Sequence, residues 1–134
     1  MSLLGVTKGT DLEKQIDQIA VLESQAVTMY TGMAILAREQ GYDDVADYLT
    51  ALAADEARHA GLYAVLNGHI KSDFFEVLKT VESLESGSVK KLQEFAQKIR
   101  SLGLAHAAQA VEEAALDEGR HGSILKEIVE TYCK

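Results

Sequence analysis

The sequence predicts an all-α protein, a four-helix bundle made of two repeated helical hairpins. Its 134 residues include no proline, so nothing interrupts long helices, and 47% of them are apolar, which is enough for a core. Apolar residues recur at alternating steps of three and four, the period of a helix that faces a bundle. The two halves also match at an offset of 62 residues. We therefore expect one domain over residues 1–134, with hairpins at about 11–67 and 73–131.

The first hairpin has recognisable ends. Residues 1–9 are expected to form a loose tail. Thr10 and Glu13 have the spacing of a capping box, which predicts the start of the first helix, and Gly41 is suited to end it because glycine tolerates a positive φ. Asp43 or Asp44 is expected to cap the second helix, and Asn67-Gly68 to stop it.

The second hairpin follows a short polar linker. Asp73 and Glu76 again have capping-box spacing, which predicts the start of the third helix. Ser86-Gly87-Ser88 are weak helix formers, so this helix is either continuous or broken there. Gly103 is expected to end it, and the fourth helix fills the rest of the chain.

Composition excludes several classes of partner and site. A formal charge of −8 disfavours nucleic acid and anionic membranes, since both need a basic surface. Cys133 is the single cysteine, which excludes an intrachain disulfide and a thiolate metal site within these residues. We see no signal peptide and no apolar run of the roughly 20 residues that a membrane span needs, so a cytoplasmic protein is expected.

Charged residues interrupt the apolar stripes at equivalent positions in both halves. Each half carries a Glu on its first helix and a Glu-x-x-His on its second, and that spacing puts the two side chains on one helix face. Both sets lie at matching heights from their turn glycine. The six residues are Glu23, Glu56, His59, Glu85, Glu118 and His121.

Four carboxylates in a bundle core need a comparable positive charge, because an unpaired buried carboxylate costs several kcal/mol. The stripes offer no Lys or Arg at that level. Four Glu and two His around two metal ions is a known bundle site, and oxygen-rich ligation with imidazole suits iron or manganese better than zinc. The alternative is that each motif is a solvated Glu–His pair on a helix face. Such a pair would then have arisen twice, at the same offset of 62 residues.

Several neighbours are candidates for supporting roles. Glu82, one turn before Glu85, is either a seventh, mobile ligand or a surface residue; the first half has Ala20 at that place. Tyr30 is either a catalytic residue or a packed core tyrosine. A further set either orients the ligand histidines or forms surface salt bridges: Asp55, Arg58, Asp117 and Arg120. His69 and His106 are expected at the surface.

The sequence resembles the rubrerythrins over roughly residues 12–130. The first-hairpin resemblance lies in Glu23 with Tyr30, Gly41-Tyr42 and Glu56-x-x-His59, and the second-hairpin resemblance in Glu82-x-x-Glu85 and Glu118-x-x-His121. The doubled Asp-Glu-x-Arg-His string is also similar to that of oxygen-activating diiron oxidases. Two departures are the lack of rubredoxin-type cysteines and Lys90-Lys91-Leu92 where the family has a tyrosine.

The resemblance implies a ferritin-like bundle with a non-haem diiron centre. Its ligands would be the six residues above, with Glu82 as a redox-mobile seventh. The implied activity is reduction of hydrogen peroxide with electrons from a separate protein such as a rubredoxin. Dioxygen activation, ferroxidase or iron handling, and a metal-free interaction module are the alternatives, and manganese or zinc could replace the two iron ions.

The linker between the hairpins is short for that fold. Leu66 lies about 15 Å beyond Glu56 and Asp73 about 18 Å before Glu85, so parallel second and third helices require a crossing of about 33 Å. Seven residue steps reach at most about 25 Å. Either the second hairpin belongs to another chain in a domain-swapped homodimer, or the four helices run up-down-up-down in a monomer.

Overall fold

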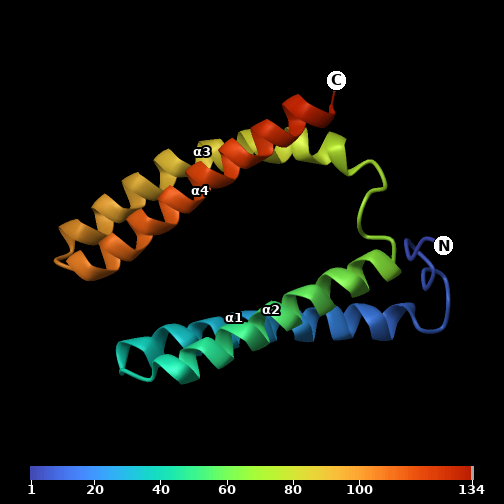
Figure 1. The fold of residues 1–134 in the computed structure, drawn as a ribbon, viewed down its shortest axis with the longest axis horizontal. Helices are drawn as coiled ribbons and strands as arrows, with labels where there is room; N and C mark the ends of the chain where they lie inside the picture. Colours follow the sequence, from blue (N-terminus) through green and yellow to red (C-terminus); the bar gives the residue numbers. More distant parts are fainter. Residues whose placement is uncertain (134) are drawn as a thin grey trace. The chain divides into compact units, whose positions relative to one another are not determined.

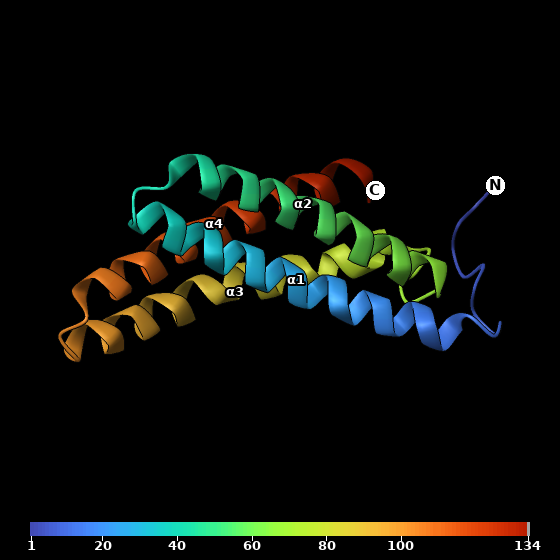
Figure 2. The ribbon, with the colours of Figure 1, turned by 90° about the horizontal axis from the view of Figure 1, so that it is seen from below.

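The computed structural model describes residues 1–133 and contains four α-helices. The chain divides into two compact units, Met1–Ser72 and the part that begins at Asp73. Each unit is one antiparallel helical hairpin, α1 with α2 and α3 with α4 (Figures 1 and 2). The predicted all-α fold with two hairpins is confirmed. The helices are α1 (Glu13–Glu39), α2 (Asp43–Leu66), α3 (Phe74–Ser101) and α4 (Ala105–Tyr132).

The two hairpin turns have the same construction. Gly41 has a φ of 83° and Gly103 a φ of 81°, a region that L-residues with a side chain rarely adopt. In the first turn the Tyr42 N–H donates to the Ala37 carbonyl. The equivalent bond, 62 residues later, runs from the Leu104 N–H to the Ile99 carbonyl. The repeat predicted from sequence therefore extends to the hydrogen bonds of the turns, and both glycines end their helices as expected.

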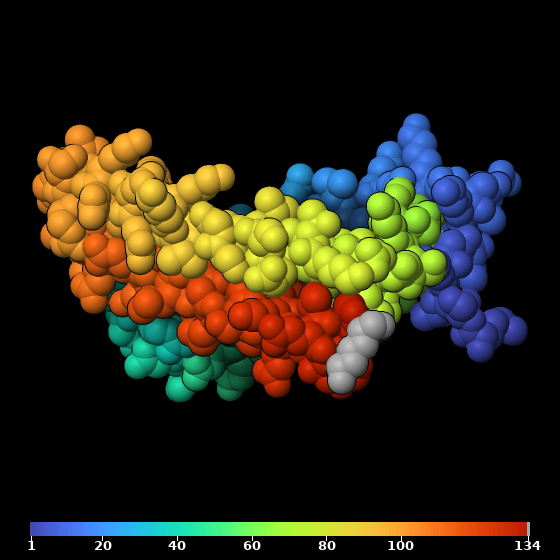
Figure 3. Space-filling view, turned by 90° about the horizontal axis from the view of Figure 1, so that it is seen from above, coloured from blue at the N-terminus to red at the C-terminus, as the bar shows by residue number. Residues whose placement is uncertain are grey.

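Small residues form the contact between the helices of each hairpin. Figure 3 shows α3 and α4 side by side along their length. The buried apolar residues are all alanines, and three pairs of them are equivalent in the repeat: Ala34 and Ala96, Ala46 and Ala108, Ala53 and Ala115. Larger apolar side chains such as Leu52 and Phe95 stay about half exposed. One hairpin therefore buries little of its own apolar stripe, and the stripe remains free to face a second layer of helices.

Two sequence predictions about helix caps are wrong. Thr10 does not cap α1, because its hydroxyl donates to the Thr7 carbonyl and the helix begins at Glu13. Neither Asp43 nor Asp44 caps α2: Tyr42 is the N-cap and has no side-chain cap bond. Of the two alternatives for the third helix, the continuous one is observed, since α3 runs through Ser86 without a break. The predicted cap of α3 is confirmed, because the Asp73 carboxylate accepts the Glu76 N–H at 3.4 Å.

The N-terminal tail is not loose, which corrects a further expectation. The N–H groups of Gly5 and Thr7 donate to the carbonyls of Val65 and Leu66, at 2.9 and 3.0 Å. These carbonyls belong to the last turn of α2, where no intrahelical donor is available. The tail thus satisfies the end of α2 and ties the N-terminus to it.

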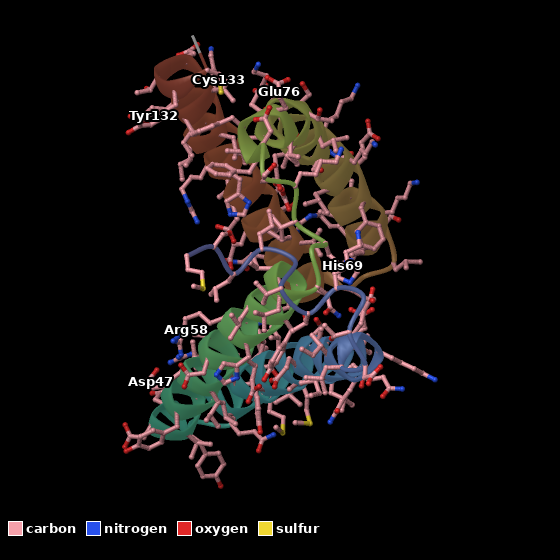
Figure 4. All side chains as sticks on the ribbon, turned by 90° about the vertical axis from the view of Figure 1, so that its right-hand side faces the viewer. Asp47, Arg58, His69, Glu76, Tyr132 and Cys133 are labelled. Carbon is pink, nitrogen blue, oxygen red and sulfur yellow. The ribbon has the colours of Figure 1, made fainter. Side chains whose placement is uncertain are left out.

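Asn67 holds this junction together. It is 1% exposed, and its Nδ2 donates to the Glu13 carbonyl at 2.8 Å and to Asp17 Oδ1 at 2.7 Å. The Thr7 hydroxyl donates to its Oδ1, and His69 Nε2 lies 2.7 Å from the same Asp17 oxygen. Figure 4 shows His69 just beyond the end of α2. We call these five residues the Asn67 clamp; it joins the tail, the start of α1 and the start of the linker.

The clamp also affects an ionisation. The hydrogen bonds from Asn67 and then His69 lower the pKa of Asp17 from its usual 3.8. A carboxylate with a lowered pKa in the folded state stabilises the fold above its unfolded pKa, and the contribution is lost as pH falls through the lowered value. The clamp is therefore intact at neutral pH.

Replacing Asn67 with alanine will destabilise the first hairpin. The substitution removes three hydrogen bonds of a buried amide, each worth about 1 kcal/mol net, so the free energy of unfolding should fall by about 2–3 kcal/mol. Thermal unfolding followed by circular dichroism will measure it. Gln40→Ala, which removes an exposed amide at the end of α1, is the control. Equal melting temperatures for the two variants would contradict the role of the clamp.

Helix α1 alone, among the described residues, is long and apolar enough to cross a membrane by length and composition. The sequence reading expected no such segment. A core helix of a bundle passes the same test, and α1 carries Asp17 and Glu23 within its span, which are costly in a bilayer. Its apolar stripe is better explained as the bundle-facing side.

Candidate metal centre

The first hairpin brings its three predicted ligands together. Glu23 comes from α1, and Glu56 and His59 come from successive turns of α2. His59 Nδ1 lies 3.5 Å from Glu56 Oε2 and 3.7 Å from Glu23 Oε2. One donor atom from each residue lies within 4.8 Å of the others. The helix spacing predicted this shared face, and the hairpin adds the carboxylate from the opposite helix.

The second hairpin forms an equivalent triad. His121 Nδ1 lies 3.4 Å from Glu85 Oε2 and 3.8 Å from Glu118 Oε2, and the donor atoms again fall within 4.8 Å. In both triads the imidazole therefore faces the carboxylates through Nδ1. The residues that repeat in the sequence therefore also have the same arrangement in space within each hairpin.

The two triads have the right chemistry for a hard or borderline metal ion. Two carboxylate oxygens and one imidazole nitrogen suit iron, manganese or zinc, whereas a thiolate donor is absent from each triad. Ligands about 2 Å from one ion lie about 3–4 Å apart, so each triad would close by about 1 Å or less on binding. The residues present therefore fit a metal ion.

Burial separates the carboxylates from the imidazoles. The side chains of Glu23 and Glu56 are 18% and 23% exposed, whereas that of His59 is 46% exposed. Within a single hairpin the triad thus lies along the apolar stripe with its imidazole open to solvent. A face with two half-buried carboxylates is stabilised by a cation between them.

The two carboxylates of the second triad, Glu85 and Glu118, interact directly with each other. A hydrogen bond with Glu85 raises the pKa of Glu118, and partial burial and the negative charge of Glu85 raise it further. The same hydrogen bond, with His121, lowers the pKa of Glu85. The two carboxylates therefore shift in opposite directions. Metal ligands must be deprotonated, so a metal ion competes with protons at this triad.

The other predicted site residues lie near the triads but outside them. Glu82 is half-buried one turn before Glu85, and its Oε1 accepts a hydrogen bond from the Ser86 hydroxyl at 3.4 Å. Tyr30 is half-buried two turns after Glu23 on α1. Whether either residue acts in catalysis stays a prediction.

The acidic and basic neighbours form ion pairs on the exposed side of α2 and α4. Arg58 Nη2 lies 2.5 Å from Asp55 Oδ1, and Arg120 Nη2 lies 2.8 Å from Asp117 Oδ1. Figure 4 shows Arg58 pointing outward from its helix. Pairing with arginine agrees with one of the two sequence readings, and the proposed hydrogen bond to a ligand histidine stays a prediction.

Two features near the site were missed from the sequence. The contact between Glu85 and Glu118, which shifts their pKa values in opposite directions, requires knowing how α3 packs on α4. The contact of Ser86 with Gly122 is of the same kind, since Gly122 is buried against that serine. Only the exchange of Ala60 for Gly122 across the repeat hinted at it.

Comparison with known proteins identifies the family. The rubrerythrin family matches residues 19–75, which include the whole first triad. The chain is 31% identical over 134 residues to reverse rubrerythrin-1 of Clostridium acetobutylicum, covering 98% of this chain and 74% of that protein. It is 35% identical over 131 residues to an uncharacterized protein of Methanocaldococcus jannaschii, covering 98% and 93% of the two chains.

The match to reverse rubrerythrin-1 extends through both hairpins and therefore through both triads. The all-α fold, the doubled Glu/Glu/His geometry and this similarity agree. The chain belongs to the rubrerythrin family, whose fold is a ferritin-like four-helix bundle.

Proposed function

We propose that the protein is a non-haem diiron oxidoreductase that reduces hydrogen peroxide to water. The observation that carries the proposal is the doubled triad: two carboxylates and one imidazole, repeated with distances that differ by 0.3 Å between hairpins. Together the triads provide four carboxylates and two imidazoles, the donor set of carboxylate-bridged metal pairs in bundles. Membership of the rubrerythrin family supports iron as the metal.

An iron pair held by the two triads would supply the two electrons of the reaction. Reduction of one peroxide consumes two electrons and two protons and yields two waters. Each triad would hold one metal through its imidazole Nδ1 and its carboxylates. Glu82, half-buried next to the second triad, is the candidate for an additional, mobile ligand.

The electrons would come from a redox site outside these 134 residues. These 134 residues contain one cysteine, so they lack the four thiolates of a rubredoxin-type iron site. A separate rubredoxin-like donor is the expected partner. The acidic surface, with a net charge of −8, favours a docking surface with basic residues on that donor.

Reoxidation kinetics test the activity. Iron-loaded, chemically reduced protein is mixed in a stopped-flow instrument with hydrogen peroxide or with dioxygen at equal concentration. We expect peroxide to reoxidise it at least about tenfold faster, which corresponds to a difference in barrier of about 1.4 kcal/mol. Equal rates, or a faster reaction with dioxygen, would reject the peroxidase assignment in favour of an oxygen-activating protein or a ferroxidase.

Iron turnover separates the remaining alternatives. A ferroxidase would oxidise ferrous iron beyond the two ions held by one pair of triads, whereas a peroxidase would stop at that number without a reductant. Absence of bound iron, manganese and zinc, with a melting temperature that a chelator leaves unchanged, would instead indicate a metal-free interaction module.

We further propose that the triads of one centre come from two chains in a homodimer. In a ferritin-like bundle one long crossover joins the hairpins, so α3 runs parallel to α2. In this chain the clamp fixes His69 to Asp17, six residues and about 9 Å before Glu23 along α1. Phe74, the first residue of α3, precedes Glu85 by eleven residues, about 16 Å.

The linker does not span that distance. A parallel arrangement places the two ends on opposite sides of the metal level, so the chain would have to cross about 25 Å. The five steps from His69 to Phe74 reach at most about 18 Å. Exchange of hairpins between two chains removes the conflict and gives the exposed apolar stripe of each hairpin a partner. An up-down-up-down monomer is the competing arrangement.

A further inference from the structure

Two of the differences between the halves of the chain lie beside one serine next to the candidate centre. Glu82 occupies the position that Ala20 has in the first half, and Gly122 occupies the position of Ala60. Both differences meet at a serine that the halves share, Ser24 in the first and Ser86 in the second. The surroundings of this hydroxyl therefore differ between the two halves, although the serine itself is shared.

The hydroxyl of Ser86 has an unusual partner. Other serines in these helices donate to backbone carbonyls, three of them to the carbonyl four residues earlier: Ser24 to Ala20, Ser88 to Leu84 and Ser123 to Gly119. Ser86 instead donates to the side chain four residues earlier, at 3.4 Å from Glu82 Oε1. The equivalent serine, Ser24, thus donates to a backbone carbonyl, whereas Ser86 donates to a side-chain carboxylate.

Gly122 provides the space for this arrangement. A Cβ atom at position 122 would lie 2.6 Å from Ser86 Oγ and 3.5 Å from Ser86 Cα, and Gly122 is buried. A methyl group there would push the hydroxyl aside. The first half has Ala60 at the equivalent position, and there the Ser24 hydroxyl donates to the backbone carbonyl of Ala20. Glycine and the carboxylate partner therefore occur together in the half that carries Glu82.

We infer that Ser86, with the space left by Gly122, is a positioning residue for Glu82. The inference rests on the proposed function, because it concerns a carboxylate beside the metal. The serine holds the carboxylate one turn from Glu85, outside the triad. At 3.4 Å the bond is longer than the usual distance of about 2.7–2.8 Å for a hydroxyl donor, so a metal ion can displace the hydroxyl from the carboxylate. Serine and metal compete for one side chain.

Metal affinity tests the competition. Zinc(II) is the probe, titrated against a chromophoric competitor, because it has no redox chemistry and the result is independent of peroxide activity. Removing the hydroxyl in Ser86→Ala should raise zinc affinity about three- to tenfold, since Glu82 no longer has the competing partner. Ser86→Thr, which keeps a hydroxyl, should restore the wild-type value. Ser24→Ala is the matched control from the other half and should leave the affinity unchanged.

A second background shows whether Glu82 transmits the effect. In Glu82→Gln protein, Ser86→Ala should change zinc affinity by less than about twofold, because the carboxylate is already gone. Gly122→Ala should reproduce the increase of Ser86→Ala, and the two changes together should give no more than either alone. If Gly122→Ala fails to fold, the Ser86 series decides.

The inference is overturned if Ser86→Ala has the same effect with and without the Glu82 carboxylate, or no more effect than Ser24→Ala. Failure of the peroxidase assignment would show separately, as slow reoxidation by peroxide in protein whose zinc affinity still depends on Ser86. The two conclusions therefore fail in different measurements.

Discussion

The double variant Glu56→Gln, Glu118→Gln will bind no iron under conditions in which the wild type takes up two ions for each pair of triads. Each substitution replaces one anionic oxygen ligand of a triad with a neutral amide of the same shape. Removing a hydrogen-bond partner of a metal ligand lowers metal affinity by about 10–100-fold. Removing one ligand from each triad should lower the affinity further than this. Peroxide reduction should fall with the iron, by at least about 1000-fold.

Iron analysis after gel filtration measures the first effect, and peroxide consumption measures the second. Glu39→Gln with Glu127→Gln is the control pair, since both residues are exposed and one lies on each hairpin. Circular dichroism shows that the helices persist. Full iron occupancy in the Glu56/Glu118 variant would show that the triads are not the metal site.

A mixed dimer of two inactive chains will regain one working centre if hairpins are exchanged. One chain carries Glu56→Gln and His59→Ala, and the other carries Glu118→Gln and His121→Ala. In an exchanged dimer one bundle combines the two damaged hairpins and the other combines the two intact ones. We expect the mixed dimer, isolated through two different affinity tags after coexpression, to hold half of the wild-type iron and half of its activity.

The competing arrangements give a different result. If both hairpins of a centre belong to one chain, every bundle in the mixture contains one damaged triad, and neither iron nor activity returns. Wild-type protein prepared in parallel separates this outcome from a failure to bind metal at all. Lengthening the linker by ten Gly/Ser residues after His69 should then shift the exchanged dimer toward monomer, because a loop of that length can cross the bundle.

Local sequence rules predicted those parts of the fold that depend on neighbouring residues. The helix periods, the turn glycines Gly41 and Gly103 and the Asp73 cap all follow from residues within a few positions of one another. The triads were predictable for a related reason. A Glu and a His three apart share a helix face, and the 62-residue repeat supplied the two opposite glutamates, Glu23 and Glu85.

The failures involve groups that found partners outside their own segment. The hydroxyl of Thr10 was available for a cap but bonds the tail at Thr7. Asp43 lies 3.8 Å from Arg38 across the turn, in place of capping α2. Asn67 was read as a helix stop, yet it holds the tail, α1 and the linker together through side-chain bonds to residues 50 or more positions away. No sequence window contains such pairs.

The central claim is that the two triads act as one centre with two metal ions. Iron analysis combined with electron paramagnetic resonance of the oxidised protein tests it most directly. Two ferric ions that share carboxylate ligands are magnetically coupled, so we predict two irons per pair of triads and no ferric resonance. A strong signal of isolated high-spin ferric ions, with one uncoupled iron for each triad, would contradict the account.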